Sequence, residues 1–430
     1  MRSVLLSPWF WIPATLALLF ATSTVFLALF RPYMDYEVRG AIVGDGRDPA
    51  LLEAVQNATG SRLFTSTRIE TLTNGKVFYE EELKAIASAQ ESVHLEAYIF
   101  ADDDIGGQFR DAAAERAKKG VAVRFTLDSV GGMTSDDSFF EPLTQFGGRV
   151  AWYHPAKWYT WDRFNNRTHR ELLIIDGQLG FTGGAGVADT WYKPSDDGKP
   201  PWRDTFFRLT GDAVDGLQSV FAENWLEAEG EVLSAPDLYQ AKPVANGYPC
   251  LVVFGTPSAG GSTRVRTAIQ MTIAAAVETI FITNPYFLPD HGVRQELADA
   301  VKRGVRVEVI TPGTQSDQTL TSRASRRLYG ELIESGVKIH EYQPTMIHVK
   351  TVVVDSVWSV IGTTNFDPRS FALNDEVNVV VQSEEFAQRL ESDFFKDLQQ
   401  SKLVTLQEWR DRPLWEKTIE SMSRLLERQQ

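Results

Sequence analysis

The sequence His348-Val-Lys-Thr-Val-Val-Val-Asp355 has a related copy 179 residues earlier, which reads His169-Arg-Glu-Leu-Leu-Ile-Ile-Asp176. A short segment with glycine follows each copy, Gly362-Thr-Thr-Asn365 in the second and Gly183-Gly-Ala-Gly186 in the first. Self-similarity of this kind indicates a duplicated structural unit. Because a histidine stands at the start of each copy, we expect one active site assembled from two halves of the chain.

The repeat extends beyond these segments and predicts the fold class. In each half an apolar run, an amphipathic stretch and a second apolar run follow one another, at residues 93–100, 105–119 and 120–128 and again at 280–287, 293–303 and 304–311. This alternation is typical of βαβ units around a sheet that is buried on both faces. We therefore expect an α/β fold with two similar lobes, each a mixed sheet flanked by helices.

The length of 430 residues is sufficient for two domains. A linker with proline and glycine at residues 230–248 separates the halves, so we expect a first lobe at 34–235 and a second at 236–408. From Trp415 to Leu426 apolar residues recur at steps of three and four, which predicts an amphipathic C-terminal helix at 409–430. We expect this helix to pack on the body of the protein; attachment to a membrane surface is the alternative.

The N-terminal segment carries no charged residue between Val4 and Phe30, and Arg2 and Arg31 flank it. An apolar run of this length predicts one transmembrane helix, within a membrane anchor at residues 1–33. A cleaved signal peptide is the alternative, but its apolar region is usually shorter and ends at a small-residue cleavage site. The few flanking charges do not indicate on which side of the membrane the rest of the chain lies.

The amino-acid composition indicates which classes of partner and cofactor the chain is expected to lack. The chain has 43 Lys and Arg against 57 Asp and Glu, a formal net charge of −14, which would repel a nucleic-acid backbone. A single cysteine, Cys250, excludes an intramolecular disulfide, and no cysteine–histidine cluster has the spacing of zinc ligands. We therefore expect no nucleic-acid partner, no metal and no other cofactor.

The second copy of the repeat has the chemistry of a phosphate site. Strand periodicity places His348 and Lys350 on one face, where a phosphate would meet an imidazole and an ammonium together. A two-residue turn would pair position 354 with 357 and position 348 with 363. This register would bring Thr363 and Asn365 back beside His348, where a hydroxyl and an amide can donate hydrogen bonds to an anion. The segment predicts half of a phosphate pocket.

The same segment resembles the His-x-Lys-x4-Asp motif of the phospholipase D superfamily, which precedes Gly-Ser-x-Asn and Asp-x-Arg-Ser. Here the motif reads His348, Lys350, Asp355, Gly362-Thr-Thr-Asn365 and Asp367-Pro-Arg369-Ser370, with threonine where serine is usual. The bacterial cardiolipin synthase branch is more similar still. Its further motifs are matched, in the right order, at Leu95–Phe100, Trp202–Thr205, Pro285–Phe287 and Arg412–Trp415. The resemblance covers nearly the whole chain.

The resemblance implies a pseudo-twofold axis that brings both motifs around one phosphodiester. It implies that His169 attacks phosphorus to form a phosphohistidine, that His348 protonates the leaving alcohol and then activates the incoming one, and that Lys350 takes part in catalysis. The repeat itself predicts that the two histidines approach each other within roughly 6 to 8 Å, so that one phosphate can contact both. The resemblance also implies that a downstream carboxylate orients each histidine, with Asp204 in the first half and Glu376 in the second as candidates.

The sequence also suggests where four further residues lie. Asp176 and Asp355 lie at the expected turns and are expected to stabilise them. Tyr98 and Tyr286 follow apolar runs, where they line either the pocket or the core.

The reaction implied is phosphatidyl transfer in a bacterial inner (cytoplasmic) membrane. Its substrates would be a phospholipid such as phosphatidylglycerol and an alcohol acceptor, so that two phosphatidylglycerols give cardiolipin and glycerol. One alternative is a hydrolase that acts on phosphodiesters. Another is a catalytically silent lipid-binding protein.

The first copy departs from the motif at two positions, because Glu171 stands where lysine is usual and Gly186 stands where asparagine is usual. Replacing a cation by an anion near a phosphate reverses an interaction of roughly 1 to 4 kcal/mol. Three explanations are open. Glu171 forms a salt bridge with Lys350 or with one of three arginines (Arg163, Arg167 and Arg170), it recognises a group on the substrate, or the first half has lost its catalytic role.

Overall fold

The structure is a computed structural model that describes residues 8–29, 37–38, 48–155, 165–255, 263–313 and 319–413. The chain forms two compact units, residues 1–35 and 36–430. The first contains one helix, α1 (Pro8–Leu29), whose side chains at Trp11, Leu16 and Phe20 are exposed. Within the described residues, none of the helices combines the length and the apolar character needed to cross a membrane. The expected helix is present, and the prediction that it spans a bilayer is not supported by this finding.

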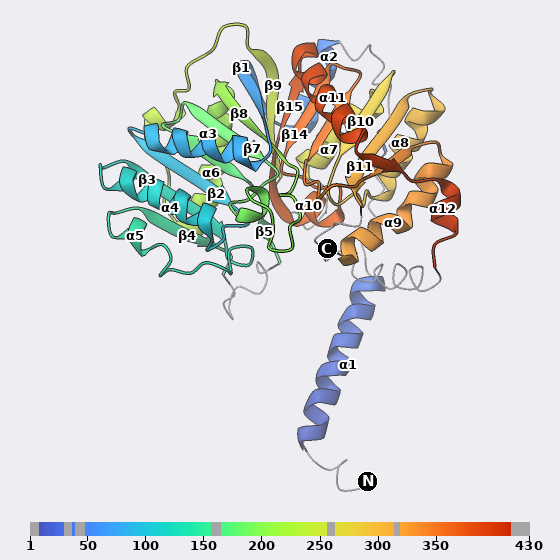
Figure 1. Cartoon of the computed structure of the whole chain (residues 1–430), viewed down its shortest axis with the longest axis horizontal. Coiled ribbons are helices and arrows are strands. Elements are labelled where there is room, and N and C mark those ends of the chain that lie inside the picture. Colours follow the sequence, from blue (N-terminus) through green and yellow to red (C-terminus); the bar gives the residue numbers. More distant parts are fainter. Residues whose placement is uncertain are drawn as a thin grey trace. The chain divides into compact units, whose positions relative to one another are not determined.

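The second unit is built on one mixed sheet that has 16 strands in the described part of the chain (Figure 1). The strands of the first half are β1 (Arg62–Thr73), β2 (Ser92–Ala97), β3 (Ala122–Asp128), β4 (Arg149–Tyr153), β5 (Arg167–Thr168), β6 (Leu172–Ile175), β7 (Leu179–Gly183) and β8 (Thr205–Gly211). Those of the second half are β9 (Tyr248–Gly255), β10 (Thr279–Thr283), β11 (Arg306–Pro312), β12 (Lys338–Tyr342), β13 (Thr351–Val354), β14 (Trp358–Gly362), β15 (Asn374–Gln382) and β16 (Ser401–Leu403).

Helices cover both faces of this sheet. In the first half they are α2 (Pro49–Thr59), α3 (Gly75–Ser88), α4 (Asp104–Ala117), α5 (Glu141–Thr144), η1 (Asp189–Trp191) and α6 (Ala213–Glu229), and η2 (Pro236–Tyr239) follows. In the second half they are α7 (Arg264–Ala274), α8 (His291–Lys302), α9 (Thr319–Glu334), α10 (Pro368–Ala372), α11 (Glu384–Leu398) and α12 (Leu406–Arg410). The amphipathic helix expected at 409–430 lies mostly outside the described residues, which end at residue 413.

The order of the strands repeats outward from the centre of the sheet. β9 and β1 pair with each other in the middle, β15 and β8 flank them, and β14-β13-β10-β11-β12 on one side answers to β7-β6-β2-β3-β4 on the other (Figure 1). This arrangement matches the expected pseudo-twofold relation between halves. The sheet is continuous across the centre, however, and residues 36–430 form a single compact unit. The lobe boundary at 235/236 falls between α6 and β9 and stays a prediction.

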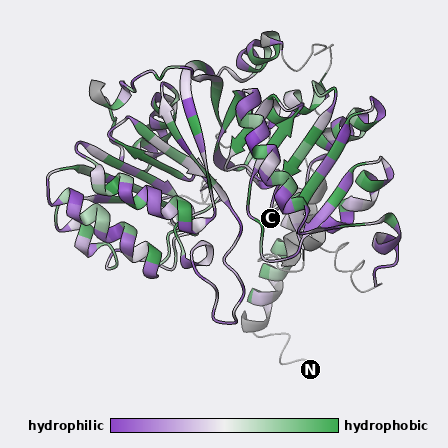
Figure 2. Ribbon diagram, turned by 45° about the horizontal axis from the view of Figure 1, so that its top comes forward, coloured by the Kyte–Doolittle hydropathy of each residue, from purple (hydrophilic) through white to green (hydrophobic). Residues whose placement is uncertain are grey.

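The core explains why the halves are joined. Leu172 and Ile174 of β6 pack in the same hydrophobic cluster as Val353 of β13, together with apolar residues of α6 and α11. The alternate residues Leu173 and Val352 point to the opposite face of the sheet, into two separate clusters. Strands buried on both faces are mainly hydrophobic, as Figure 2 shows for many of the inner strands, whereas the helices carry hydrophilic stretches. One face of the sheet therefore has a core shared by both halves.

The hairpin register differs from the expected one by one residue. Val354 pairs with Trp358 instead of residue 357, and the same shift continues to Thr351, which pairs with Ile361. Asp355 and Ser356 have φ angles of 53° and 55°, and Val357 is an extra turn residue whose N–H donates to Val354 O. The first half has the same turn, in which Ile175 pairs with Leu179. A turn with three residues, not two, causes the shift.

The turn aspartates attach each hairpin to a neighbouring strand. Asp355 accepts hydrogen bonds from the backbone N–H groups of Val277, Glu278 and Thr279, at 2.8 to 2.9 Å. Asp176 accepts equivalent bonds from residues 90–92. Each carboxylate therefore satisfies three backbone donors at the start of β10 or β2.

Asp355→Ala is expected to lower the free energy of unfolding by about 1 to 3 kcal/mol, because three backbone donors lose their acceptor. Denaturant unfolding of the full chain measures the change, and Asp355→Asn, which keeps one acceptor oxygen, should lose less. Equal stability of Asp355→Ala and the wild type would show that these bonds do not matter.

Candidate active site

His348 lies just before β13 and is held by residues of the first half. Its backbone N–H donates to Arg203 O at 2.7 Å, and its Nδ1 lies 3.0 Å from Asp204 Oδ2. Asp204 also accepts from the Thr205 N–H at 2.8 Å and from Trp191 Nε1 at 3.2 Å. An imidazole that donates through Nδ1–H keeps the lone pair or the exchangeable proton on Nε2. Asp204 thus fixes the orientation of the ring.

His169 is held by residues of the second half in the same way. Its backbone N–H donates to Asp375 O at 2.9 Å, and its Nδ1 lies 3.0 Å from Glu376 Oε1 and 3.1 Å from Oε2. Glu376 also accepts from the Thr363 hydroxyl at 2.5 Å. The ring of Tyr98 lies edge-on to His169, with centroids 5.4 Å apart.

Each carboxylate therefore contacts the histidine of the opposite half. The sequence places Asp204 downstream of His169 and Glu376 downstream of His348, but Asp204 contacts His348 and Glu376 contacts His169. The exchange has a structural cause, because His169 follows β5, which pairs with β15 next to Glu376. The two histidine–carboxylate pairs thus connect the halves.

Lys350 lies beside His348 and contacts a glycine of the first half. Its Nζ is 3.1 Å from His348 O, 3.4 Å from Gly184 O and 3.0 Å from His348 Nδ1. A Cβ on Gly184 would lie 2.7 Å from both His348 O and Asp204 Oδ1, so a side chain here would force the halves apart. The glycine-containing segment of the first copy is required by this close approach.

The return strand does not place Thr363 as expected. Thr363 lies against Glu376, on the His169 side of the site, and not beside His348. Asn365 is buried, and its Oδ1 has no hydrogen-bond partner among the described residues. The register shift of one residue accounts for the difference at Thr363.

Glu171 does not form the expected salt bridge with a described cation. Arg167 pairs with Asp128 at 3.3 Å and Arg170 with Glu223 at 2.6 Å, and within the described residues no Lys or Arg nitrogen lies within 4.0 Å of Glu171. Arg163 lies outside the described residues. Instead, Glu171 Oε1 accepts a hydrogen bond from the Tyr98 N–H at 3.1 Å. Burial raises the pKa of Glu171 well above its usual value, and the charge of Lys350 opposes this only partly.

Gly186 has no room for the usual asparagine. A Cβ there would lie 2.7 Å from Ile99 O and 2.8 Å from Ile99 Cβ, and the carbonyl of Gly186 accepts from the buried Tyr79 hydroxyl at 2.5 Å. The glycine is therefore part of the packing of the first half.

Sequence reasoning missed two buried carboxyls near the site. Glu96 of β2 accepts from the hydroxyl of Thr168, the residue before His169, at 2.5 Å. Asp367 caps α10 through the Ser370 N–H, and burial raises its pKa to about 6, although His169 and Arg369 oppose the rise. Both lie in segments that the family motifs contain, but no spacing in the sequence indicates their neighbours. The described residues contain no group of three or more His, Cys, Asp or Glu side chains placed to hold a metal ion.

Comparisons with known proteins identify relatives of this chain. Residues 269–398 match the family described as "Cardiolipin synthase, PLD-like domain". Cardiolipin synthase 2 of Bacillus anthracis is 34% identical over 401 residues, which are 92% of this chain and 77% of the relative. Cardiolipin synthase of Alkalihalophilus pseudofirmus is 35% identical over 367 residues, 84% of this chain and 72% of the relative.

The fold has a counterpart among solved structures. Phosphatidylserine synthase of Haemophilus influenzae superposes with a TM-score of 0.69 at 14% identity, covering 89% of this chain and all of that one. Sequence similarity over nine-tenths of the chain and a shared fold lead to one assignment: the chain belongs to the cardiolipin synthase branch of the phospholipase D superfamily.

Proposed function

We propose that this protein transfers a phosphatidyl group from one phospholipid to the hydroxyl of another, so that two phosphatidylglycerols give cardiolipin and glycerol. The observation that carries the proposal is the pair of histidine–carboxylate contacts that cross between the halves, His169–Glu376 and His348–Asp204. The relatives' names indicate the product, and a membrane lipid supplies both the donor and the acceptor alcohol.

In the first step, Nε2 of neutral His169 attacks the phosphorus of the donor phospholipid. The bond from phosphorus to the glycerol headgroup breaks, and protonated His348 gives its Nε2 proton to the leaving oxygen. Glu376, at Nδ1 of His169, stabilises the positive charge that develops on the ring. Lys350 is placed to stabilise the negative charge on the phosphoryl oxygens. The products are a phosphohistidine and free glycerol.

In the second step, the hydroxyl of a second phosphatidylglycerol attacks the phosphohistidine. His348, now neutral, takes the hydroxyl proton, and the bond between phosphorus and His169 breaks. Both histidines return to their starting protonation states. Asp204 keeps the His348 ring oriented in both steps, because it binds Nδ1 and leaves Nε2 to carry the proton.

We further propose that the protein works at the bacterial inner membrane and that residues 1–33 attach it there. The support is the uncharged sequence from Val4 to Phe30 and the exposed apolar side chains of α1. Replacing Leu18 and Phe20 by lysine should move the full-length protein from the membrane fraction to the soluble fraction of cells. Unchanged fractionation of this variant would contradict the proposal.

Incubation of the purified protein with vesicles of phosphatidylglycerol tests the reaction, with products separated by mass spectrometry. Cardiolipin and glycerol in equal amounts are expected. Phosphatidic acid and glycerol would identify a hydrolase, in which water replaces the acceptor alcohol. Neither product, under conditions where a related cardiolipin synthase is active, would identify a silent lipid-binding protein.

A further inference from the structure

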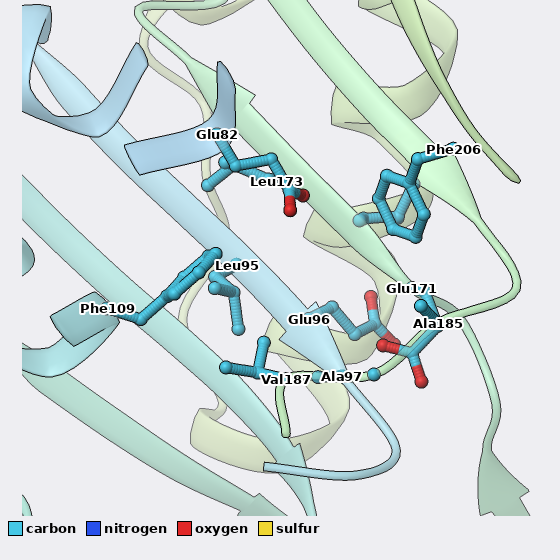
Figure 3. A pocket seen from close by; sticks show the side chains of 12 residues that line it. Glu82, Leu95, Glu96, Ala97, Phe109, Glu171, Leu173, Ala185, Val187 and Phe206 are labelled. Atoms are coloured by element: carbon cyan, nitrogen blue, oxygen red, sulfur yellow. The ribbon is translucent and has the colours of Figure 1, made fainter. Parts of the chain in front are cut away.

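Three buried glutamates surround a small cavity in the first half of the protein. Glu82 of α3, Glu96 of β2 and Glu171 before β6 line this cavity of about 10 Å³. Their exposed fractions are 4%, 1% and 5%. Figure 3 shows the carboxyl groups of Glu96 and Glu171 turned toward each other, whereas the carboxyl group of Glu82 lies apart from them, near Leu173 (Figure 3).

Glu96 has one satisfied oxygen and one unsatisfied oxygen. Its Oε1 accepts from the Thr168 hydroxyl at 2.5 Å and from Asn224 Nδ2 at 2.6 Å. Its Oε2 is buried and has no hydrogen-bond partner among the described residues. A buried carboxylate oxygen of this kind needs a donor. A cavity of about 10 Å³ is at the lower limit for one water molecule, so the donor is either such a water or a protonated neighbour.

Glu171 connects the cavity to the active-site histidine. Its Oε1 accepts from the Tyr98 N–H, and the ring of Tyr98 lies edge-on to His169. Glu96 reaches the same histidine from the other side, because its partner Thr168 is the preceding residue. The two carboxyls therefore hold both of the segments that border His169.

The surrounding charges disfavour ionisation of all three carboxyls. Glu82 and Glu96 act against an ionised Glu171, while Lys350 is the cation that favours it. Burial raises the pKa of Glu96 to about 7, although Arg170 opposes the rise, and raises the pKa of Glu82 well above its usual value. Burial also raises the pKa of Tyr79, on which Glu82, Glu171 and Asp204 act, and Asp375 adds to the rise of the Glu96 pKa. Carboxyls that share a buried site cannot all be ionised.

We propose that Glu171 is a positioning residue for His169 that works as a neutral carboxylic acid: its carbonyl oxygen holds the Tyr98 backbone, and its hydroxyl supplies the donor that Glu96 Oε2 lacks. The proton is retained by the pair and is not transferred to substrate. The first half thus replaces the usual lysine by a neutral acid, not by a charge that repels phosphate. Only the activity measurement that tests this inference depends on the proposed function.

Two substitutions of Glu171 test whether its carboxyl group is neutral or charged. Glu171→Gln preserves a carbonyl acceptor for Tyr98 and an N–H donor for Glu96, so kcat should stay within about twofold of the wild type. Glu171→Leu removes both contacts, and kcat should fall about ten- to a hundredfold with little change in KM, because His169 loses its alignment. Glu82→Gln is the matched control, a cavity residue without the Tyr98 contact, and should retain the wild-type kcat. Equal loss in Glu171→Gln and Glu171→Leu would overturn the proposal.

The pH dependence of thermal stability gives a second test that needs no activity. Carboxyls with raised pKa values hold protons in the folded state that the unfolded state has released, so their contribution is complete below about pH 4.5 and is lost as pH rises. The wild type should lose Tm as pH rises above about 5, and Glu171→Gln should lose clearly less. Parallel Tm curves would contradict a neutral Glu171. If the wild type makes no cardiolipin, the proposed function fails, and the Tm comparison still decides this inference.

Discussion

His169→Ala is expected to lower the rate of cardiolipin formation by about 10⁴-fold or more, because it removes the atom that bonds to phosphorus. The contacts of His169 with Asp375 O and Glu376 place its ring at the junction of the halves without burying it fully. The measurement is the initial rate with phosphatidylglycerol vesicles, together with detection of a phosphatidyl–histidine adduct by peptide mass spectrometry. The variant should give no adduct.

His348→Ala is the matched control, because it removes a histidine from the equivalent position of the other half. It should also lower turnover severely, but a slowly formed adduct on His169 should remain detectable, since the nucleophile is intact. An adduct that survives in His169→Ala and disappears in His348→Ala would show that the roles of the two histidines are reversed.

Lys350→Gln is expected to lower kcat by about 10²- to 10³-fold, the usual effect of losing one donor to a developing negative charge. The decrease in kcat should be near the upper end of this range, because the first copy of the motif has Glu171 in place of a second lysine. Lys84→Gln, at an exposed helical position, is the control and should leave kcat unchanged. A Lys350→Gln variant with a raised KM and normal kcat would show that the lysine binds the ground state only.

The repeat made the fold predictable to a large extent. The apolar runs Leu172–Ile175, with four residues, and Val352–Val354, with three, indicate strands buried on both faces, and these strands occupy equivalent places in the sheet. The pairing of β1 with β9 has no signal in the sequence. The linker suggested two separate lobes, but that contact and the shared core join them into one unit. The predicted hairpin register was wrong by one residue. Asp355 adopts the left-handed conformation and accepts a hydrogen bond from the backbone before a neighbouring strand, and the turn has three residues.

The candidate site was predictable as a set of residues but not as a set of contacts. The repeat identified both histidines, and the family resemblance implied their carboxylates, Asp204 for His169 and Glu376 for His348. In the structure both pairings are exchanged. A salt bridge was one of three explanations open for Glu171, but no described cation pairs with it, and its burial beside Glu82 and Glu96 favours the neutral acid. Gly186 is explained by packing against Ile99, which no local pattern reveals.

The most direct test of the central claim is a crystal structure of the protein with vanadate, which imitates a phosphoryl group in transfer. If one active site spans the two halves, a single vanadate should lie between His169 and His348. The two Nε2 atoms should be about 6 to 8 Å apart, with Lys350 within hydrogen-bonding distance of a vanadate oxygen. Vanadate bound at one histidine alone, or at two separate sites, would contradict the account.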